Sequence, residues 1–496
     1  MHSSSSNSTS SLGRPLGNLE VFFRSLSDQG KPLNREHWTI HLALTLEFPL
    51  SIRDPVPYLK CAWQVVRLRH PELEAQVSSA QDTTNPVSQP RLVPSDLDVN
   101  AWVENTFFIF QDYSCADDAF SGLHATSTPT CNWLPASSQL VLRASHWRTD
   151  GVGMALLGHD FMIALASSMR QGHEPLLVAR TLGTDGFHSG PVSIPSSLEE
   201  LARTQSRYPD LHGSEENPIL AAGADALVAQ FLKGIPSIGL PTIADSETVV
   251  PSWSDRTARA LDADTTARIS SACRNMGFTV TSAVHAAIVS TAASFPQHPL
   301  AKSYAAFVPV DLRQTLGGSA NQTIGLYFSG LPVYIDSSLF QQGAASFELI
   351  ARHLGSVYSR DLVHFWRPSG SGSEGEYLSL LDLVEPYVRR TTMLFNAPVP
   401  ENLPSIQTPD LSSLGKLERY IQPEYHLEDS EEAVQVVGVW MGTEMLNRSI
   451  QFHVWSWKGS LNLAASFNTS FYEKKFVAGV VDLIIKDLLA GCKVSE

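Results

Sequence analysis

The sequence contains few cysteines, and they are scattered along the chain. Its 496 residues include five of them, and no two are spaced as CxxC. The five are Cys61, Cys115, Cys131, Cys273 and Cys492. This odd number and wide spacing argue against a disulfide framework and against a zinc site. They favour a reducing setting such as the cytoplasm.

Long apolar segments are also missing from the sequence. No run approaches the roughly 20 apolar residues that a transmembrane helix requires. The first twelve residues, MHSSSSNSTSSL, lack the apolar core of a secretory signal peptide. We therefore expect residues 1–14 to form a disordered tail and the protein to bind no membrane.

Basic residues are in the minority, with 35 lysines and arginines against 50 aspartates and glutamates. The formal net charge is −15. An acidic surface repels phosphate backbones and anionic headgroups, so the composition argues against a nucleic-acid partner. Any anionic ligand would need a local pocket of basic side chains or backbone amides.

The remaining composition is that of a folded protein, with 43% hydrophobic and 17% charged residues. Because the chain is too long for one core of ordinary size, we expect two domains. We place an N-terminal half at 15–215, a linker or crossover at 216–245 and a C-terminal half at 246–496. Strands are mixed with long helices in both halves, which indicates an α/β or α+β fold.

Hydrophobic periodicity locates several elements of this fold. Helical spacing of apolar residues predicts a helix over 152–169. The segment 264–292 indicates two consecutive helices. Asp264 is a candidate N-cap for the first of them, and Thr279 or Thr281 can begin the second.

The stretch SQLVLRASHWRTDG (138–151) carries the strongest chemical signal. An alternating apolar run ends there, and His146, Asp150 and Gly151 follow just before the predicted helix. A histidine at the end of a strand is held by a rigid element and titrates near neutrality. It can therefore accept a proton from an alcohol or an amine. Asp150 can fix the turn, and the glycine allows the backbone to turn into the helix.

The residues alone leave two other interpretations of this stretch open. His146 can be a half-buried histidine with satisfied hydrogen bonds, and Asp150 can be only the N-cap of the next helix. The two side chains can also bind a metal, because His and Asp four residues apart can share a helix face. Here both precede the helix, and the sequence offers no obvious third ligand.

Six separated features, in order along the chain, resemble the CoA-dependent acyltransferase superfamily. They are AWQVVRLRHPELEAQV (62–77), HWRTDG (146–151), GFTVTSAVHAAI (277–288), VPVDLR (308–313), LSSLGKLE (411–418) and GSLNLAASFNTSFYEKKFVAGVVDLI (459–484). This superfamily includes the BAHD plant enzymes, fungal trichothecene acetyltransferases, alcohol acetyltransferases and the condensation domains of peptide synthetases. The resemblance spans about residues 59–489.

The resemblance implies two chloramphenicol-acetyltransferase-like domains, each a mixed sheet with flanking helices, and a tunnel between them. His146 would be the general base in that tunnel. It would deprotonate the acceptor, which would attack the thioester directly without a covalent acyl-enzyme. The family's aspartate is structural and pairs with an arginine, which here implies a pair between Asp150 and Arg313.

Two departures from the family pattern narrow the resemblance. The chain has no DFGWG motif, and Ser145 stands where condensation domains usually have a second histidine. Together with the SSLG strand, these features resemble the stand-alone fungal O-acetyltransferases, such as the trichothecene 15-O-acetyltransferase group. By analogy with that strand, Ser412 is a candidate oxyanion donor and Ser413 a second one, although both serines can simply pack a close strand. The N–H of Gly151 is a further candidate donor.

The activity implied is acyl transfer, most simply of acetyl, from acyl-CoA to a hydroxyl of a terpenoid or polyketide. Acyl-CoA would be a co-substrate, with no permanently bound cofactor and no metal, and we expect a cytoplasmic monomer. Two alternatives stay open. One is a condensation-like enzyme that uses a carrier-bound donor or promotes cyclisation. The other is a non-catalytic binding protein on the same fold. The residues that would contact CoA cannot be assigned from the sequence.

Overall fold

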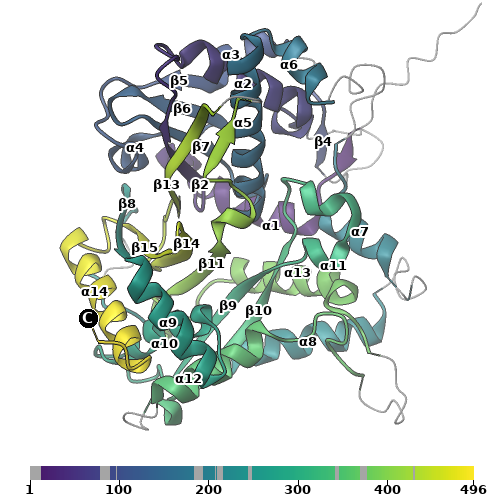
Figure 1. The fold of residues 1–496 in the computed structure, drawn as a ribbon. Coiled ribbons are helices and arrows are strands. Elements are labelled where there is room, and N and C mark those ends of the chain that lie inside the picture. The colour runs from purple at the N-terminus through teal and green to yellow at the C-terminus, as the bar shows by residue number, and fades with distance from the viewer. Residues whose placement is uncertain are drawn as a thin grey trace, which may run out of the picture.

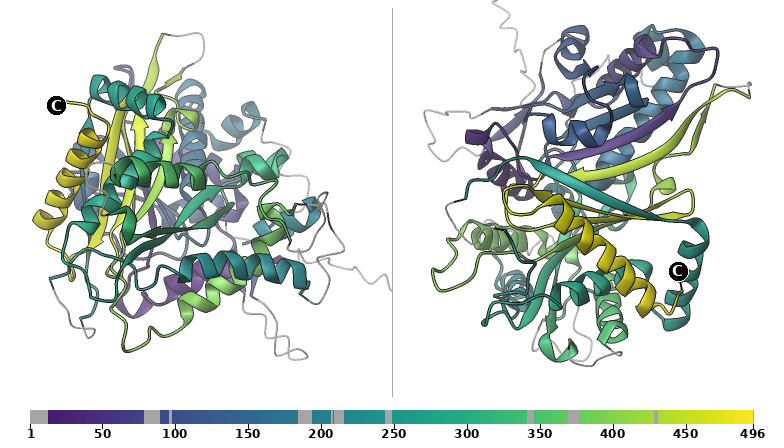
Figure 2. Two further views of the ribbon diagram at one scale, coloured as in Figure 1. Left: turned by 90° about the horizontal axis from the view of Figure 1, so that it is seen from below. Right: turned by 90° about the vertical axis from the view of Figure 1, so that its left-hand side faces the viewer.

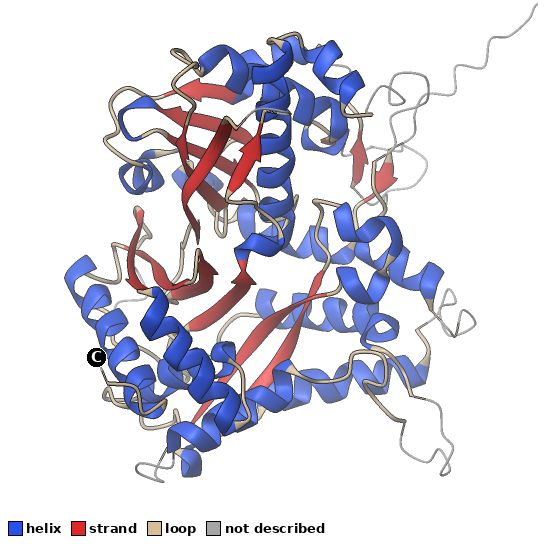
Figure 3. Cartoon of the chain, viewed as in Figure 1, coloured by secondary structure: helices blue, strands red, loops and turns tan. Residues whose placement is uncertain are grey.

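The protein is described here by a computed structural model, in which two halves lie one above the other (Figure 1). The structure describes residues 13–78, 90–95, 98–183, 194–206, 208, 216–243, 249–340, 346–368, 377–427 and 431–495. Residues 1–12 of the expected tail lie outside this set, whereas Arg14 and Pro15 form the short strand β1. The expected mixed α/β architecture is confirmed by the alternation of strands and helices in both halves (Figure 3).

The N-terminal half contains one six-stranded sheet in the order β12-β13-β2-β7-β6-β5, antiparallel except for the pair β5 and β6. Its strands are β2 (Ile40–Glu47), β5 (Phe107–Ile109), β6 (Thr130–Leu134), β7 (Gln139–Ala144), β12 (Glu424–His426) and β13 (Ala433–Thr443). Its helices are α2 (Val56–Arg69), α3 (Val99–Thr106), α4 (Ala116–Gly122), α5 (Gly151–Gln171) and α6 (Pro175–Thr181).

The C-terminal half contains a four-stranded sheet, β11-β14-β15-β8, and a two-stranded sheet, β10-β9. Its strands are β8 (Ser254–Leu261), β9 (Ser303–Asp311), β10 (Phe328–Asp336), β11 (Asp410–Lys416), β14 (Gln451–Trp457) and β15 (Ser460–Asn468). Its helices are α7 (Leu198–Gln205), α8 (Pro218–Leu232), α9 (Ala263–Met276), α10 (Val280–Ala293), α11 (Arg313–Leu316), α12 (Ser346–Tyr358), α13 (Leu380–Asn396) and α14 (Lys474–Gly491).

Two smaller elements lie near the junction of the halves. A three-stranded sheet joins β1 (Arg14–Pro15), β4 (Arg91–Val93) and β3 (Gln76–Ser78). Helix α1 (Asn18–Asp28) lies between the halves (Figure 1) and packs against α13. The segment 216–245, which the sequence assigns to a linker or crossover, contains α8, and this helix also packs against α13.

The chain crosses from the C-terminal half into the N-terminal sheet and back again. After β11 it forms β12 and β13, and β13 pairs with β2 over eight positions from Gln435↔Glu47 to Thr443↔Ile40. In Figure 1 these late, yellow-green strands therefore lie among the blue and purple ones. Glu444, just after β13, forms buried ion pairs with Arg35 at 3.0 Å and Arg143 at 3.4 Å. The crossover is thus fixed by backbone pairing and by buried charge.

The four-stranded sheet contributes to both hydrophobic cores. On β14, Phe452 and Val454 belong to the C-terminal core, which α14 covers on the outer side (Figure 2). Trp455 and Trp457 belong to the N-terminal core. Because successive residues of a strand point to opposite faces, one face of this sheet is turned toward the N-terminal half.

Helix α5 is the central helix of the N-terminal core, with Met154, Phe161 and Leu165 fully buried. It is long and apolar enough to cross a membrane by length and composition, with a mean hydropathy of 1.4 in its best window, and 67% of that window is buried inside the protein. In the sequence of this helix, His159 and Asp160 interrupt the apolar residues. α9 and α10 pass the same test only as a pair bent by 93°.

The N-cap of α9 lies two residues before the position predicted from the sequence. Asp262, not Asp264, is the N-cap of α9, and its carboxylate accepts a hydrogen bond from the N–H of Thr265 at 2.8 Å. Asp264 is instead an exposed residue of the first turn. Both aspartates satisfy the sequence rule for helix starts, so the periodicity alone could not separate them. Thr279 caps α10, as one of the two predicted residues.

We expect Glu444→Ala to lower the free energy of unfolding by about 3–5 kcal/mol, because two buried guanidinium groups would lose this partner. The measurement is the midpoint of denaturant unfolding. Glu431→Ala is the matched control, since Glu431 is exposed on the same crossover and its removal is expected to change stability by about 0.5 kcal/mol at most. Equal midpoints for the two variants would contradict a stabilising role for Glu444.

Candidate active site

His146 lies in a short loop between the end of β7 at Ala144 and the start of α5 at Gly151. Local hydrogen bonds hold this loop. The N–H of Arg148 donates to the carbonyl of Ser145 at 3.0 Å, and the Ser145 hydroxyl donates to Glu36 at 2.9 Å. Because β7 is an inner strand of the six-stranded sheet, the loop starts from a rigid position.

Asp150 connects this loop to both α5 and the C-terminal half. Its Oδ1 accepts a hydrogen bond from the N–H of Gly153 at 2.7 Å, which caps the helix. Its Oδ2 accepts from Arg313 Nη1 at 2.9 Å and from the N–H of Tyr327 at 2.8 Å. Both charged side chains are buried, with 4% of Asp150 and 2% of Arg313 exposed. The structure therefore brings together the two residues that the sequence pairs.

Arg313 uses its whole guanidinium in this arrangement. Besides Asp150, it bonds Asp311 at 2.9 Å and the carbonyls of Thr323 at 3.1 Å and Gly325 at 2.7 Å. Burial opposes the charge, but Asp150 and Asp311 outweigh it and raise the pKa of Arg313 above its ordinary value. Only a planar fork with five donors can satisfy several acceptors in this way.

Aromatic rings from three different elements surround the imidazole of His146. Phe23 of α1 stacks on it, with ring centroids 4.2 Å apart and planes at 12°. Phe328 of β10 lies at 5.7 Å and Trp38 at 6.3 Å. The side chain is half-buried, and its Nδ1 is buried with no hydrogen-bond partner in the described part of the chain. His146 is thus in an apolar setting at the junction of the halves.

This environment keeps the imidazole neutral. Burial lowers the pKa of His146 to about 4, against weaker opposing effects from its own backbone carbonyl and from Asp150. A ring that is neutral at pH 7 has a free lone pair and can accept a proton. Asp150 forms no hydrogen bond with the ring, since its two oxygens are used by Gly153, Arg313 and Tyr327.

Gly151 has a packing role that the sequence did not indicate. Its φ angle does not lie in the left-handed region, so the corner itself does not require glycine. A Cβ at this position would lie 2.9 Å from Cδ2 of Leu414 on β11. The glycine therefore leaves room for the side chain of Leu414, and a larger residue here would require the end of that side chain to move.

The two serines of β11 have different surroundings. The Ser413 hydroxyl lies 2.9 Å from that of Thr281 on α10, on the C-terminal side of the sheet. Ser412 is half-buried and aligns with His453 on β14. His453 in turn lies close enough to His146 for their charges to interact. Ser412 is therefore on the face of β11 that is turned toward the loop.

Sequence reasoning missed Phe23, Trp38, Phe328 and His453 as neighbours of His146. The phenylalanines occur in segments whose pattern is that of ordinary core residues. His453 is the one available signal, because it is the one ionisable residue in the mostly aromatic and apolar stretch FHVWSW. Without the strand register, nothing in the sequence places it near His146.

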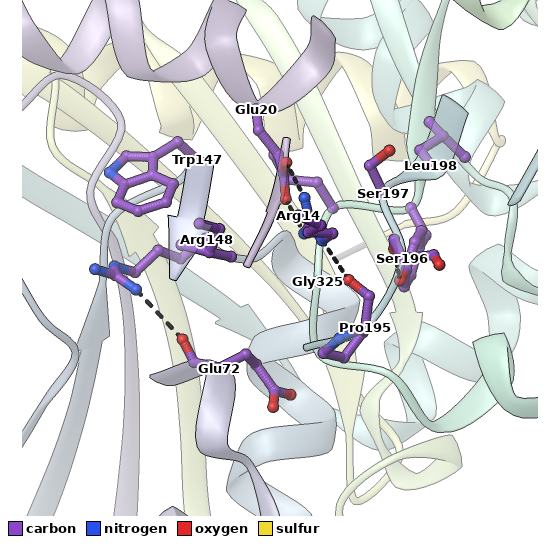
Figure 4. A pocket seen from close by; sticks show the side chains of 13 residues that line it. Arg14, Glu20, Glu72, Trp147, Arg148, Pro195, Ser196, Ser197, Leu198 and Gly325 are labelled. Carbon is purple, nitrogen blue, oxygen red and sulfur yellow. Dashed lines mark hydrogen bonds and ion pairs between the residues drawn. The ribbon is translucent and has the colours of Figure 1, made fainter. Parts of the chain in front are cut away.

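A pocket lies on the other side of the loop, beside Trp147 and Arg148 (Figure 4). The empty space in this pocket is about 420 Å³, a volume that includes the part of the pocket open to solvent. Arg14 and Glu20 face each other in it, joined by two hydrogen bonds of 2.7 and 2.6 Å. The opposite wall comes from residues 325–327 of the C-terminal half, so this hollow also lies between the halves.

No group of three or more His, Cys, Asp or Glu side chains with metal-binding geometry occurs among the described residues. The side chains of His146 and Asp150 also make other contacts instead of forming a metal site. The carboxylate is occupied by three hydrogen bonds, and the ring is packed against Phe23. The chemistry that this arrangement can perform is proton transfer by a neutral imidazole.

Comparison with known proteins identifies relatives over nearly the full length. No protein-family model matches the chain. It is 29% identical over 495 residues to the loline biosynthesis cluster 1 transcription factor lolU1 of Epichloe uncinata, covering 97% of this chain and 94% of that protein. It is 25% identical over 488 residues to the acetyltransferase pigO of Monascus ruber, covering 96% and 95%. The first name is that of a transcription factor and the second that of an acetyltransferase. The two relatives therefore suggest different functions, and the fold and the site have to distinguish between them.

Among solved structures, the trichothecene 15-O-acetyltransferase TRI3 of Fusarium sporotrichioides superposes with a TM-score of 0.71. The two chains are 16% identical, and the match covers 96% of this chain and 95% of TRI3. At this identity the match establishes the fold. The two-layered arrangement of halves around the His146 loop is therefore the fold of that enzyme.

We expect Arg313→Ala to destabilise the protein by about 3–5 kcal/mol, because Asp150 would be left as a buried carboxylate without its charged partner. Thermal and denaturant unfolding would measure this loss. Arg259→Ala is the control, since its ion pair with Asp482 is exposed and contributes about 0–1 kcal/mol. A variant as stable as the parent would show that the pair does not hold the loop.

Proposed function

We propose that this chain is a member of the CoA-dependent acyltransferase superfamily and that it transfers an acyl group from acyl-CoA to a hydroxyl of a fungal secondary metabolite. The fold shared with TRI3 and the full-length similarity to the acetyltransferase pigO support this proposal. Acetyl is the acyl group proposed, and the acceptor is a terpenoid or polyketide alcohol. The observation that carries the proposal is the neutral, half-buried His146 on a loop that Asp150 and Arg313 fix between the halves. The free cysteines of the described chain are consistent with action in the cytoplasm, and we propose a monomer there.

His146 is the general base in this proposal. Its imidazole takes the proton of the acceptor hydroxyl as the oxygen attacks the thioester carbonyl. The new C–O bond gives a tetrahedral intermediate, and cleavage of the C–S bond releases the CoA thiolate. The imidazolium then returns its proton to that thiolate. The low pKa of His146 favours this return, since the protonated ring is unstable in its apolar setting.

The negative charge of the tetrahedral intermediate needs a hydrogen-bond donor. The Ser412 hydroxyl is the proposed donor, supported by its position on the face of β11 that is turned toward the loop. The N–H of Gly151 is the second candidate, supported by the contact between Gly151 and β11. A single donor of this kind contributes about 3–4 kcal/mol to the transition state in other acyl-transfer enzymes.

Asp150 and Arg313 act through position in this proposal. They hold the loop that carries His146 against the C-terminal half, from which β10 and β11 approach the ring. The acidic surface disfavours the DNA-binding activity that the name of lolU1 would suggest.

We expect His146→Ala to lower kcat by about 10²- to 10⁴-fold, because general-base assistance is lost. The assay follows thiol release from acetyl-CoA with a panel of terpenoid and polyketide alcohols. His426→Ala is the control, since His426 is an exposed histidine. Turnover only with an acetylated carrier protein would favour the condensation-like alternative, and full activity of His146→Ala would refute the base assignment.

We expect kcat/KM to stay level from about pH 8 down to about pH 5 and to halve near pH 4, because the base works only when neutral and its pKa is lowered to about 4. An ordinary histidine would halve the rate near pH 6.5. The free energy of unfolding also decreases at acidic pH. Below pH 6.5 the unfolded chain binds the proton that folded His146 refuses, so stability falls as the pH decreases. A rate profile centred on pH 6.5 would contradict the apolar setting.

A further inference from the structure

Two of the five cysteines lie with their sulfur atoms in contact. Cys273 is in the last turn of α9, and Cys492 directly follows the last residue of α14. Their Sγ atoms are 3.8 Å apart, although the two residues are separated by 219 positions in the sequence. The helices that carry them lie next to each other in the C-terminal half (Figure 1). No other pair of cysteines in the described part of the chain forms such a contact.

The contact gives the two thiols different reactivity. Both side chains are buried in the C-terminal core, with 1% of Cys273 and 2% of Cys492 exposed. The pKa of Cys492 is lowered, because the thiol of Cys273 donates a hydrogen bond to its sulfur. Since the thiolate is the nucleophile of thiol–disulfide exchange, Cys492 is the sulfur that reacts first.

The backbone around Cys492 is already fixed against α9. The guanidinium of Arg268 on α9 donates to the carbonyl of Ser495 at 2.8 Å. The N–H of Val494 donates to the carbonyl of Leu489 at 2.9 Å, which closes the end of α14. A disulfide bond is about 2 Å long. Rotation of the cysteine side chains about their Cα–Cβ bonds can therefore bring the sulfurs together while these backbone contacts are kept.

The end of α14 is the place where an oxidant can reach the pair. Cys492 is the C-cap of this helix, and the next residue, Lys493, is exposed. The ends of helices open locally more readily than their interiors, because the last carbonyls have no partner within the helix. Opening of this last turn exposes Cys492, and its closure returns the sulfur to Cys273.

We infer that Cys273 and Cys492 form a reversible disulfide when the protein meets a low-molecular-weight disulfide such as glutathione disulfide, and that the bond ties the end of α14 to α9. In the reduced protein both residues are free thiols. This inference is independent of the proposed function, because neither cysteine takes part in acyl transfer.

The chemistry consists of two successive thiol–disulfide exchanges. The Cys492 thiolate attacks one sulfur of glutathione disulfide, which forms a mixed disulfide and releases one glutathione thiolate. The Cys273 thiol then loses its proton to that thiolate and attacks Sγ of Cys492, and the second glutathione leaves. In sum, the two cysteines lose two electrons and two protons, and one glutathione disulfide is reduced to two glutathione thiols.

The cross-link would stabilise the C-terminal half. It closes a loop that contains the strands β9 to β15, and with them Arg313. A disulfide that closes a long loop restricts the unfolded chain most strongly. It also holds α14, which covers the C-terminal core and packs on α10, in its folded position.

Peptide mapping tests the bond directly. The full chain is incubated in glutathione buffers of increasing disulfide fraction, quenched with acid, alkylated in denaturant and digested with trypsin. We expect the peptides ISSACR (269–274) and DLLAGCK (487–493) to be joined and two hydrogens lighter than their sum. Cys61 and Cys131 are the internal controls, since they are equally buried but have no sulfur neighbour, and both are expected to be alkylated. Separate alkylation of the two peptides in every buffer would overturn the inference.

Thermal unfolding tests the stabilising role. We expect the oxidised parent to unfold about 3–5 °C above the same protein treated with dithiothreitol. Cys492→Ala is expected to show no such difference. Cys115→Ala, which removes a half-buried cysteine without a sulfur neighbour, is the matched control and is expected to keep it. An equal or lower unfolding temperature of the cross-linked parent would overturn the stabilising role.

Discussion

The buried ion pair between Asp150 and Arg313 is the interaction on which the rest of the site depends. The aspartate caps α5, and the arginine is anchored to carbonyls of the C-terminal half, so one contact fixes helix, loop and domain together. An isolated buried ion pair contributes little net stability because both charges must be desolvated. Here its consequence is geometric. The loop of His146 has one position relative to β10 and β11, and the approach of substrates is defined by that position.

The electrostatic state of His146 follows from this placement. A loop held against a second domain is shielded from water, and its imidazole packs on aromatic rings without the carboxylate partner that many catalytic histidines have. The family pattern of His and Asp four residues apart suggests a charge pair, yet the two side chains have separate tasks. Burial lowers the pKa of the His146 ring. The Asp150 carboxylate caps α5 and binds Arg313. This division explains why His146 is neutral although an aspartate lies close in sequence.

Much of the fold could be predicted from the sequence, because it depends on local periodicity and on ordered motifs. The helix after Gly151, the cap at Thr279 and the residues 146, 150 and 313 are all local signals or family motifs. The packing of Gly151 against Leu414 could not be predicted, because the two residues are more than 260 positions apart in the sequence. The entry of β13 into the N-terminal sheet, the aromatic rings around His146 and the alignment of Ser412 with His453 likewise depend on strand register between distant segments. Local patterns contain no information about such register.

The return of the chain through β12 and β13 has a consequence for how the halves can exist. A fragment that stopped at residue 245 would keep β7 but lack β13, the other partner of β2, so the backbone donors and acceptors on that edge of β2 would face solvent. Such an exposed border recruits other strands and promotes aggregation. A chain divided at the boundary predicted from the sequence would therefore separate β2 from β13. The N-terminal sheet is therefore complete only when the chain extends through β13.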